Sequence, residues 1–420
     1  MKDLNQLYFD ILNNKYNKNE KMEFVLHQPE AGIESNIICL PLANEDELKQ
    51  INIKQYADLS TENVDVLCEY DYRLVKMQAG LGSSVKRDDL INEVEGRTEL
   101  GAKGTDLYFE IDGKLQSISK IQLLQANKLS EKSLYKNIYY QNLVNDQTQK
   151  TVENSLGGVE LSSKCKIVKE YFQKKMPTIS ETGELTNERM APAGHGFVGI
   201  CEIVKTFCEQ KTDELVSIGN GEDLCSTADE KITSWIVKNK IPVTMITTTK
   251  TDSDKKGGQI SLVKGADKSY VTIVEKAQAE KSNQLEYFEQ LGLREDDNES
   301  LFNTNIVVIN RKALKEVFEK YIPNLKLEKF IENISPDVIQ NSKEQDGKKF
   351  IQLESALGSV VLNLDKFFRL NFSESVVSFL NLSQKERTKF FMPIKKREDY
   401  ELIRRSFIVD KESYLLVQKD

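Results

Sequence analysis

The sequence LVKMQAGLGSS at residues 74–84, followed by GAKGTDLYF at residues 101–109, is the stretch from which the fold of this chain can be argued. An apolar run that ends in small residues predicts a strand followed by a loop, and Lys103 then follows close to two glycines. Glycine tolerates positive φ, so consecutive N–H groups of such a loop can converge on one anion, while a lysine supplies the countercharge. The pattern indicates a phosphate-binding loop at the end of a strand.

This glycine-rich stretch has a simpler interpretation as well. Glycine turns after strands often only connect two elements, and the stretch alone leaves both interpretations open. It is neither Gly-x-x-x-x-Gly-Lys-Ser/Thr nor Gly-x-Gly-x-x-Gly, since Val85 occupies the place of the third glycine in the second pattern. A simple NAD site is therefore disfavoured.

The overall composition is that of a globular protein. With 420 residues, 39% of them hydrophobic and 30% charged, the chain has enough core for two or three domains. No apolar run approaches the roughly 18 residues of a membrane span, and the first residues, MKDLN, lack the apolar core of a signal peptide. We therefore expect a cytoplasmic protein that binds no membrane. A formal net charge of −8 gives no global attraction for nucleic acid, so the expected ligand is small and held by local lysines and backbone amides.

The cysteines and histidines do not indicate a zinc site. The six cysteines include no Cys-x-x-Cys pair, and the only histidines are His27 and His195. A Cys/His zinc site is therefore not expected, and the thiols are interpreted as buried.

From residue 71 onward, short β-branched or apolar runs alternate with helical periodicity, which predicts a layered α/β domain with a mostly parallel sheet. The predicted strands are residues 74–77, 215–218, 243–247, 271–275 and 306–309. The predicted helices are residues 115–129, 165–175, 199–209, 230–239 and 311–321. Residues 283–300 and 341–349 are polar and are predicted to be surface loops. Ligands of such sheets bind at the ends of the strands, so the loops are the places to search for a site.

Two of these loops carry candidate functional side chains. In MAPAGHGF at residues 190–197, His195 lies between two glycines, directly before a predicted helix. A single histidine is more often structural, but the flanking glycines leave the His195 imidazole open to a ligand. In LVSIGNGEDL at residues 215–224, a strand ends at the adjacent carboxylates Glu222 and Asp223. Mg²⁺ binds one or two carboxylates together with phosphate oxygens, and a solvated Asn-Gly turn would give the same pattern.

Three further segments are polar or basic. Residues 252–258, DSDKKGG, form a turn with two lysines and two glycines, and FNTN at residues 302–305 precedes a predicted strand. Buried amides in FNTN would bind sugar hydroxyls through paired donor and acceptor contacts, although asparagines that cap a strand would look the same. The basic sequence FMPIKKR at residues 391–397 is by itself most simply a solvated face.

Taken in order, these segments resemble the UTP–glucose-1-phosphate uridylyltransferase family over residues 74–406. The matching segments are AGLGSS at residues 79–84, GAK at 101–103, Phe172-Gln173 with Pro177 following, PAGHG at 192–196, NGEDL at 220–224, KT at 250–251 with DKKGG at 254–258, EKAQ at 275–278, FNTN at 302–305, IQLESA at 351–356 and FMPIK at 391–395. The resemblance is an ordered series rather than a single motif.

The resemblance implies a Rossmann-like, glycosyltransferase-A-like nucleotidyltransferase fold, with a helical N-terminal segment (residues 1–70), a nucleotide-sugar-binding catalytic domain (71–385) and a small C-terminal lobe (386–420) that closes the site. It implies the following roles: catalysis by Lys103 and Lys395; nucleotide binding by Ala79, Gly80, Leu81, Gly82, Ser83, Ser84, Gln173 and Gly194; sugar binding by His195, Asn220, Gly221, Gly258, Glu275, Asn303 and Asn305; and metal binding by Glu222 or Asp223.

The implied reaction is a Mg²⁺-dependent attack of glucose 1-phosphate on the α-phosphorus of UTP, which releases pyrophosphate and UDP-glucose. The alternatives are a UDP-N-acetylhexosamine pyrophosphorylase, another UDP-sugar pyrophosphorylase, or an inactive homologue that only binds nucleotide sugars. Because many members carry a C-terminal β-helix that builds oligomers, and this chain stops soon after Ser406, we expect a monomer or a dimer.

The chain also departs from the family pattern. Ala79 replaces a glycine, Glu222 stands in place of an aspartate, and Phe197 replaces an acidic residue after Gly-His-Gly. An insertion separates the glycine-rich residues 79–84, called the glycine loop below, from Lys103. These departures leave the preferred sugar and the rate open.

Overall fold

The computed structural model describes residues 3–17, 26, 36–40, 45–60, 64–83, 85–251, 254, 257–265, 267–290, 300–345 and 347–419. Ser84, His27 and residues 252, 253, 255 and 256 of the predicted basic turn lie outside this part of the chain.

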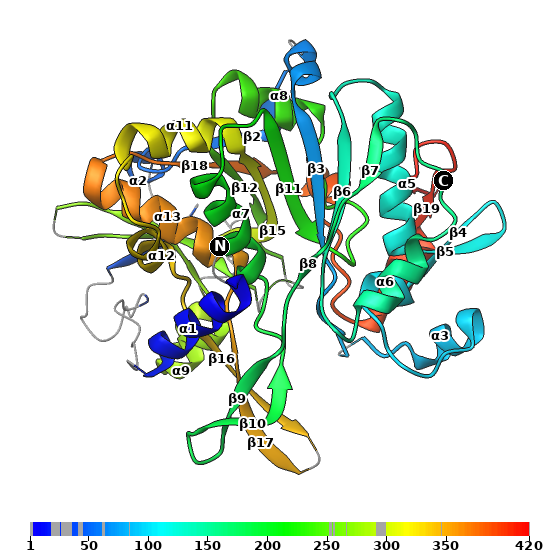
Figure 1. The fold of residues 1–420 in the computed structure, drawn as a ribbon, viewed down its shortest axis with the longest axis horizontal. Helices are drawn as coiled ribbons and strands as arrows, with labels where there is room; N and C mark the ends of the chain where they lie inside the picture. Colours follow the sequence, from blue (N-terminus) through cyan, green and yellow to red (C-terminus); the bar gives the residue numbers. More distant parts are fainter. Residues whose placement is uncertain are drawn as a thin grey trace.

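A large mixed sheet forms the centre of the protein (Figure 1). Its main path runs in the order β2 (Ile53–Gln55), β18 (Val377–Leu382), β12 (Val243–Thr249), β15 (Leu301–Asn310), β11 (Glu214–Asn220), β3 (Asp71–Met77), β6 (Ile138–Val144) and β7 (Cys165–Ile167). Neighbours on this path are parallel, except that β15 is antiparallel to both β11 and β12. Branches add β8 (Tyr171–Phe172), β13 (Gln259–Val263), β14 (Tyr270–Val274) and β1 (Ile37–Cys39). The mostly parallel mixed sheet expected from the sequence is confirmed.

Helices cover both faces of this sheet. Consecutive strand residues point to opposite faces, so Val75 packs in one core with α7 (Gly196–Cys208), α11 (Arg311–Tyr321), α12 (Leu327–Ile334) and α13 (Leu357–Phe372). Leu74 packs in a second core with α5 (Ile118–Glu131), α6 (Gln149–Leu156) and α8 (Glu230–Lys238). A sheet buried on both faces explains the nearly continuous apolar strands of the sequence.

Two smaller units flank the sheet (Figure 1). A four-stranded sheet of β10 (Leu185–Ala191), β9 (Met176–Ser180), β17 (Lys348–Glu354) and β16 (Ile339–Gln345) projects as an arm. A third core joins α3 (Asp88–Glu95), β4 (Tyr108–Ile111) and α5 to α15 (Arg397–Ser406) and β19 (Phe407–Val409). Its centre is Tyr400, whose hydroxyl donates to the Tyr108 carbonyl at 2.6 Å. The C-terminal segment is therefore packed onto the segment that follows Lys103.

Except for a 14-residue helix near the N-terminus, the remaining elements are short. They are α1 (Leu4–Asn17), α2 (Glu45–Leu48), α4 (Lys103–Asp106), β5 (Lys114–Ser117), α9 (Lys276–Lys281), α10 (Leu285–Gln290), α14 (Gln384–Phe390), β20 (Leu416–Gln418) and two 3₁₀ turns at Tyr56–Asp58 and Val64–Glu69. Among the described residues, no helix is both long and apolar enough to cross a bilayer.

Each predicted strand is present, and four of the five predicted helices are present: the helix at residues 311–321 has the predicted ends, and the other three have shifted ends. The helix predicted at residues 165–175 is wrong, because β7 and β8 pair there with β6, and this tertiary pairing overrides the local helical spacing. The loop predicted at residues 341–349 is also wrong, since residues 341–345 belong to β16 and residues 348 and 349 to β17, which pair as a hairpin. Part of the predicted loop at 283–300 is α10.

Two further expectations need correction. Residues 1–70 are only partly helical, since β1 and β2 pair with β13 and β18. The thiols are not uniformly buried: Cys165 and Cys201 are buried, whereas Cys68 and Cys208 are exposed.

A buried ionic cluster joins the two strands that lead to the loops. Arg73 on β3 donates to both carboxylate oxygens of Glu202 on α7, at 2.6 and 2.9 Å, and its Nε donates to Glu214 on β11 at 2.9 Å. The side chains of Arg73 and Glu202 are 3% and 0% exposed. Such a cluster fixes the mutual position of strand and helix, because removing one charge leaves its partner buried and unpaired.

We therefore expect Arg73→Met to lower the free energy of unfolding by about 3 kcal/mol or more, since Glu202 would remain as an unpaired buried charge. Urea denaturation followed by far-UV circular dichroism measures this change. The double variant Arg73→Met/Glu202→Leu should regain part of the loss. Lys128→Ala, which breaks an exposed ion pair with Glu131, should leave the stability almost unchanged. An Arg73→Met protein as stable as the Lys128→Ala control would refute the role given to the cluster.

Candidate functional site

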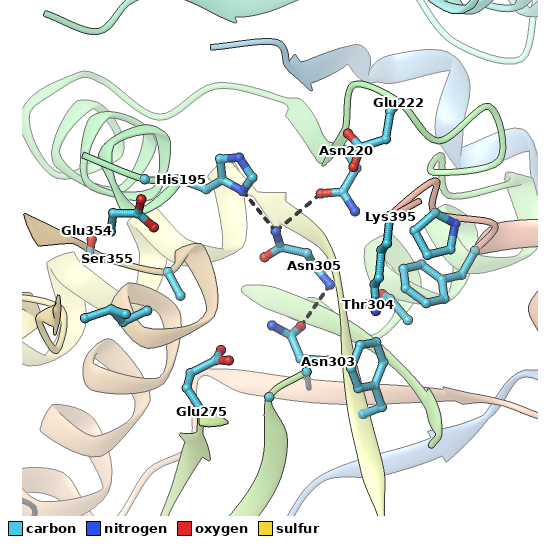
Figure 2. A pocket seen from close by; sticks show the side chains of 18 residues that line it. His195, Asn220, Glu222, Glu275, Asn303, Thr304, Asn305, Glu354, Ser355 and Lys395 are labelled. Atoms are coloured by element: carbon cyan, nitrogen blue, oxygen red, sulfur yellow. Dashed lines mark hydrogen bonds between the residues drawn. The ribbon is translucent and has the colours of Figure 1, made fainter. Parts of the chain in front are cut away.

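A cavity of about 300 Å³ lies where β11 ends and β15 begins. Figure 2 shows side chains that reach it from several elements. Nine of the residues proposed from the sequence line it: Gly194, His195, Asn220, Glu222, Gly258, Glu275, Asn303, Asn305 and Lys395. Glu354, Ser355 and Phe391 also line the cavity. Segments far apart in the sequence thus meet around one hollow.

A bulge in β15 directs one amide into this cavity. Ile246 of β12 pairs with Ile306, but the next residue, Thr247, pairs with Asn303, so β15 carries two extra residues at this point. Asn305, the second of them, has φ of 65°, a left-handed conformation that asparagine tolerates better than most residues. Thr304 fastens the bulge by donating from Oγ1 to the Ile246 carbonyl at 2.6 Å.

Asn305 then connects three polar side chains (Figure 2). Its Nδ2 donates to His195 Nδ1 at 3.2 Å and to Asn220 Oδ1 at 3.3 Å, and its backbone N–H donates to Asn303 Oδ1 at 3.0 Å. Burial lowers the pKa of His195, which favours the neutral ring. Because Nδ1 accepts a hydrogen bond, the proton of the neutral ring is on Nε2. The wall therefore offers both donors and acceptors to a ligand.

The turn that carries His195 is fastened by the N-terminal helix. Tyr8 of α1 is buried, and its hydroxyl donates to the Ala193 carbonyl at 2.8 Å and lies 2.5 Å from Ser355 Oγ. Gly194 has φ of 79°, and a Cβ at Gly196 would lie 1.9 Å from Ser355 Oγ, so neither position tolerates a side chain. Nothing in the sequence around Tyr8 distinguishes it from an ordinary core residue of an amphipathic helix.

Two carboxyl groups face the cavity without a cationic hydrogen-bond partner in the described part of the chain (Figure 2). Burial raises the pKa of Glu275, which precedes α9, to about 7, and burial also raises the pKa of Glu354 at the end of β17. Glu354 accepts a hydrogen bond from Asn341 Nδ2 at 3.1 Å. Gly258 lies against Glu275, where a Cβ would be 2.6 Å from Oε1. Carboxyls and amides at this density suit a ligand with many hydroxyl groups.

Lys103 joins the cavity to the glycine loop. Its Nζ donates to Glu222 Oε1 at 2.6 Å and to the Ile394 carbonyl at 3.0 Å. The aliphatic part of the Lys103 side chain crosses Gly82. A Cβ added to Gly82 would lie 2.5 Å from Cγ and Cδ of Lys103. Burial tends to raise the pKa of Glu222, but the Lys103 ammonium outweighs this effect and holds the pKa below its ordinary value. Lys103 and Glu222 are therefore a charged pair in the free protein.

The two adjacent carboxylates of this turn have different surroundings. Glu222 lines the cavity, whereas Asp223 is fully buried and accepts hydrogen bonds from the backbone N–H groups of Cys225 at 2.9 Å and Met392 at 3.0 Å. Burial raises the pKa of Asp223 to about 7. Within the described ranges, no group of three or more His, Cys, Asp or Glu side chains could hold a metal. A Mg²⁺ ion that binds mostly phosphate oxygens needs only one or two carboxylates, and Glu222 is placed to supply one.

Lys395 reaches the cavity from the C-terminal segment (Figure 2). Its Nζ lies 3.3 Å from Asp254 Oδ1 and 5.1 Å from the centre of the Phe302 ring. Arg387 also donates to Asp254, at 2.6 Å. The ammonium is thus held at the rim by a carboxylate and an aromatic face.

The other proposed residues lie around the cavity rather than in its wall. Ala79 is buried, with its carbonyl accepting from Asn145, while Gly80 and Ser83 are exposed, and Leu81 and Gly82 are partly exposed. Gln173 is buried and donates to the Gly194 carbonyl at 2.8 Å. Gly221 packs against Gln78, and a Cβ added to Gly221 would lie 2.4 Å from Cδ of Gln78. The placement of Ser84 lies outside the described residues.

Sequence reasoning missed Arg87, Tyr8 and Glu354. Arg87 is fully buried beside the glycine loop, although in the sequence it is one basic residue in a charged stretch. Only Glu354 had a sequence signal, since it stands inside the matched segment IQLESA.

Comparison with known proteins gives a consistent result. The family model described as UTP–glucose-1-phosphate uridylyltransferase matches residues 98–420. Curated relatives with this name include a protein of Encephalitozoon cuniculi, 28% identical over 59% of this chain and 45% of its own length, and one of Hordeum vulgare, 27% identical over 64% of this chain and 51% of its own. The chain therefore spans about half the length of these relatives.

Solved structures show the same fold. A UDP-glucose pyrophosphorylase of Leishmania major aligns with a TM-score of 0.61 at 23% identity, over 87% of this chain and 72% of that one. A UDP-glucose phosphorylase of Trypanosoma brucei aligns with a TM-score of 0.65 at 19% identity, over 98% and 78%. A mutant of the Leishmania major protein was solved in complex with UDP-glucose.

The family model covers well over half of the chain, and the fold agrees with it. The chain belongs to the UTP–glucose-1-phosphate uridylyltransferase family.

Proposed function

We propose that this protein is a nucleotidyltransferase that forms UDP-glucose and pyrophosphate from UTP and glucose 1-phosphate. The observation that carries the proposal is the position of Lys103. Its ammonium contacts Glu222 in the wall of a cavity lined by amides and carboxyls, and its aliphatic part lies across Gly82 of the glycine loop. The curated relatives bear the name of this activity, and a mutant of one structural neighbour binds UDP-glucose.

In this proposal the cavity holds the sugar. Asn305, Asn303, His195 and Glu275 would bind the hydroxyl groups, since together they offer amide, imidazole and carboxyl partners. The nucleotide would lie on the side of Gln173, Gly194 and the glycine loop. Lys103 and Lys395 would face the phosphates between these two parts.

The reaction needs no protein nucleophile. A phosphate oxygen of glucose 1-phosphate attacks the α-phosphorus of UTP, a new P–O bond forms, and the bond to the bridging oxygen of the β-phosphate breaks, so that pyrophosphate leaves. Two anions must approach in line, so positioning and charge neutralisation by Lys103, Lys395 and the loop amides lower the barrier. Mg²⁺ held by Glu222 and phosphate oxygens would supply further charge neutralisation.

Release of pyrophosphate from UTP, measured over a panel of sugar 1-phosphates with and without Mg²⁺, tests the proposed function. Turnover with glucose 1-phosphate supports it. Preference for N-acetylhexosamine 1-phosphates would favour the related pyrophosphorylase. Nucleotide binding without turnover on any sugar would show a binding homologue instead.

Lys103→Ala should lower turnover about a hundredfold or more while the fold survives, because the ammonium is placed to neutralise phosphate charge. Pyrophosphate release gives the rate, and circular dichroism reports the fold. Lys128→Ala, on the surface of α5, is the matched control. If Lys103→Ala keeps turnover close to that of the control, Lys103 has no part in the mechanism.

Glu222→Ala should abolish Mg²⁺-dependent turnover, whereas Asp223→Asn should retain a substantial part of it. Asp223 already accepts two backbone hydrogen bonds, so its variant should instead lower thermal stability. A Mg²⁺ titration of the rate and a melting curve separate the two effects. The opposite ranking of the variants would assign the metal to Asp223.

Glu275→Gln should remove a pH dependence from kcat/KM for the sugar phosphate near pH 7. As pH rises through the raised pKa of about 7, the native carboxyl ionises and accepts hydroxyl hydrogen bonds more strongly, so native kcat/KM should rise relative to the variant. The ratio of the two proteins, measured between about pH 5.5 and 8.5, cancels the titration of the substrate itself. A flat ratio contradicts contact between Glu275 and the sugar.

A further inference from the structure

Arg87 is a fully buried arginine directly beside the glycine loop. Its Nη2 donates to the carbonyl oxygens of Leu81 at 2.5 Å and Gly101 at 2.9 Å, and its Nη1 donates to those of Gly82 at 3.1 Å and Val85 at 3.0 Å. Its Nε donates to Asp106 at 3.1 Å. All five N–H groups of the guanidinium are therefore used, four of them on backbone carbonyls of the loop and of the segment before Lys103.

These contacts determine which way the loop faces. Carbonyl oxygens of residues 81, 82 and 85 are turned toward the cation, so the loop curls around Arg87. In the described part of the chain, the amide nitrogens of Gly80, Leu81, Gly82 and Ser83 donate to no other residue. A loop whose carbonyls converge on a buried cation leaves its amides available to an anion on the other side.

The same contacts hold Lys103 in place. Asp106, which is buried in α4, accepts from Arg87, from Arg97 at 2.7 Å and from the Gly101 N–H at 2.7 Å. Lys103 begins this helix, and its stem lies across Gly82 of the loop. Arg87 thus connects the glycine loop to Gly101, directly before α4, and makes the loop and α4 one unit.

We infer that Arg87 is a positioning residue for the triphosphate of the nucleotide: it holds the glycine loop, with its amides open, before the substrate arrives. This inference rests on the proposed function. A loop already ordered in the binding conformation loses less entropy when the ligand binds. Lysine cannot replace Arg87 in this role, because its single ammonium lacks the planar fork that reaches four carbonyls at once.

The variants Arg87→Lys and Arg87→Met test the inference against the control Arg97→Gln. Arg97 shares Asp106 but donates to no carbonyl of the glycine loop. Calorimetric binding of UTP and the separate KM values for UTP and glucose 1-phosphate are the measurements. Melting curves show whether each variant is folded at the assay temperature.

We expect both Arg87 variants to bind UTP about 10- to 100-fold more weakly, because several charge-assisted hydrogen bonds that shape the loop are lost. The KM for glucose 1-phosphate should stay within about threefold, and Arg97→Gln should change UTP binding by no more than about threefold. If Arg87→Met does not fold, Arg87→Lys, which keeps the charge, decides the question.

Unchanged UTP binding in a folded Arg87 variant overturns the inference, as does an equal loss for both substrates or an equal loss in Arg97→Gln. A purely structural arginine would lower the melting temperature without this selective effect on UTP. If the native protein neither binds UTP nor releases pyrophosphate, the proposed function fails first. A native protein that does both, alongside unaffected Arg87 variants, refutes the positioning role alone.

Discussion

The pair between Lys103 and Glu222 is the interaction on which the arrangement of the site depends. The two side chains are each 17% exposed and 2.6 Å apart, and Lys103 also binds the Ile394 carbonyl. Three segments thereby meet: the glycine loop, the turn after β11 and the C-terminal segment. Partial burial strengthens the attraction between the two charges. In the proposed reaction, the negative charge of a phosphate would compete with Glu222 for Lys103. The pair therefore holds these segments together in the free protein, and in the proposed reaction it would open when phosphates bind.

The sheet explains why the cavity forms beside this pair. β15 runs antiparallel to β11 and β12, so its first residues lie at the edge where β11 ends. Asn305, near the start of one strand, consequently meets Asn220, at the end of another. The bulge at residues 304 and 305 then supplies the rotation that brings Asn305 to His195. A regular β15 would alternate its side chains between the faces and would not reach both partners from one position.

The sequence predicted those parts of the structure that depend on local pattern. Apolar runs located the strands, and glycines next to polar residues located the loops that meet at the cavity. Contacts between distant segments were not predictable. The apolar spacing of residues 165–172, which pair with β6, could not be distinguished from that of a helix. Tyr8 and Arg87 are single residues that belong to no sequence motif. The adjacent carboxylates Glu222 and Asp223 likewise look equivalent until Asp223 is seen to accept backbone hydrogen bonds.

Under the proposed function the cavity must admit an anionic sugar phosphate, and the charges around it bear on that entry. The cavity wall carries Glu222, Glu275 and Glu354, which would repel such a substrate if all three were ionised and unpaired. Glu222 is paired with Lys103, while burial raises the pKa of Glu275 to about 7 and raises that of Glu354. Near neutral pH Glu275 is thus partly protonated. In the proposed sugar contact its ionised form would gain more from a direct hydroxyl hydrogen bond than it would lose by repulsion of a more distant phosphate. Lys395, paired with Asp254 at the rim, remains 42% exposed and adds positive charge where the phosphate would pass. In the proposed reaction, the pairing of Glu222 with Lys103 and the exposed charge of Lys395 would each lower the electrostatic cost of bringing phosphorylated substrates to this cavity.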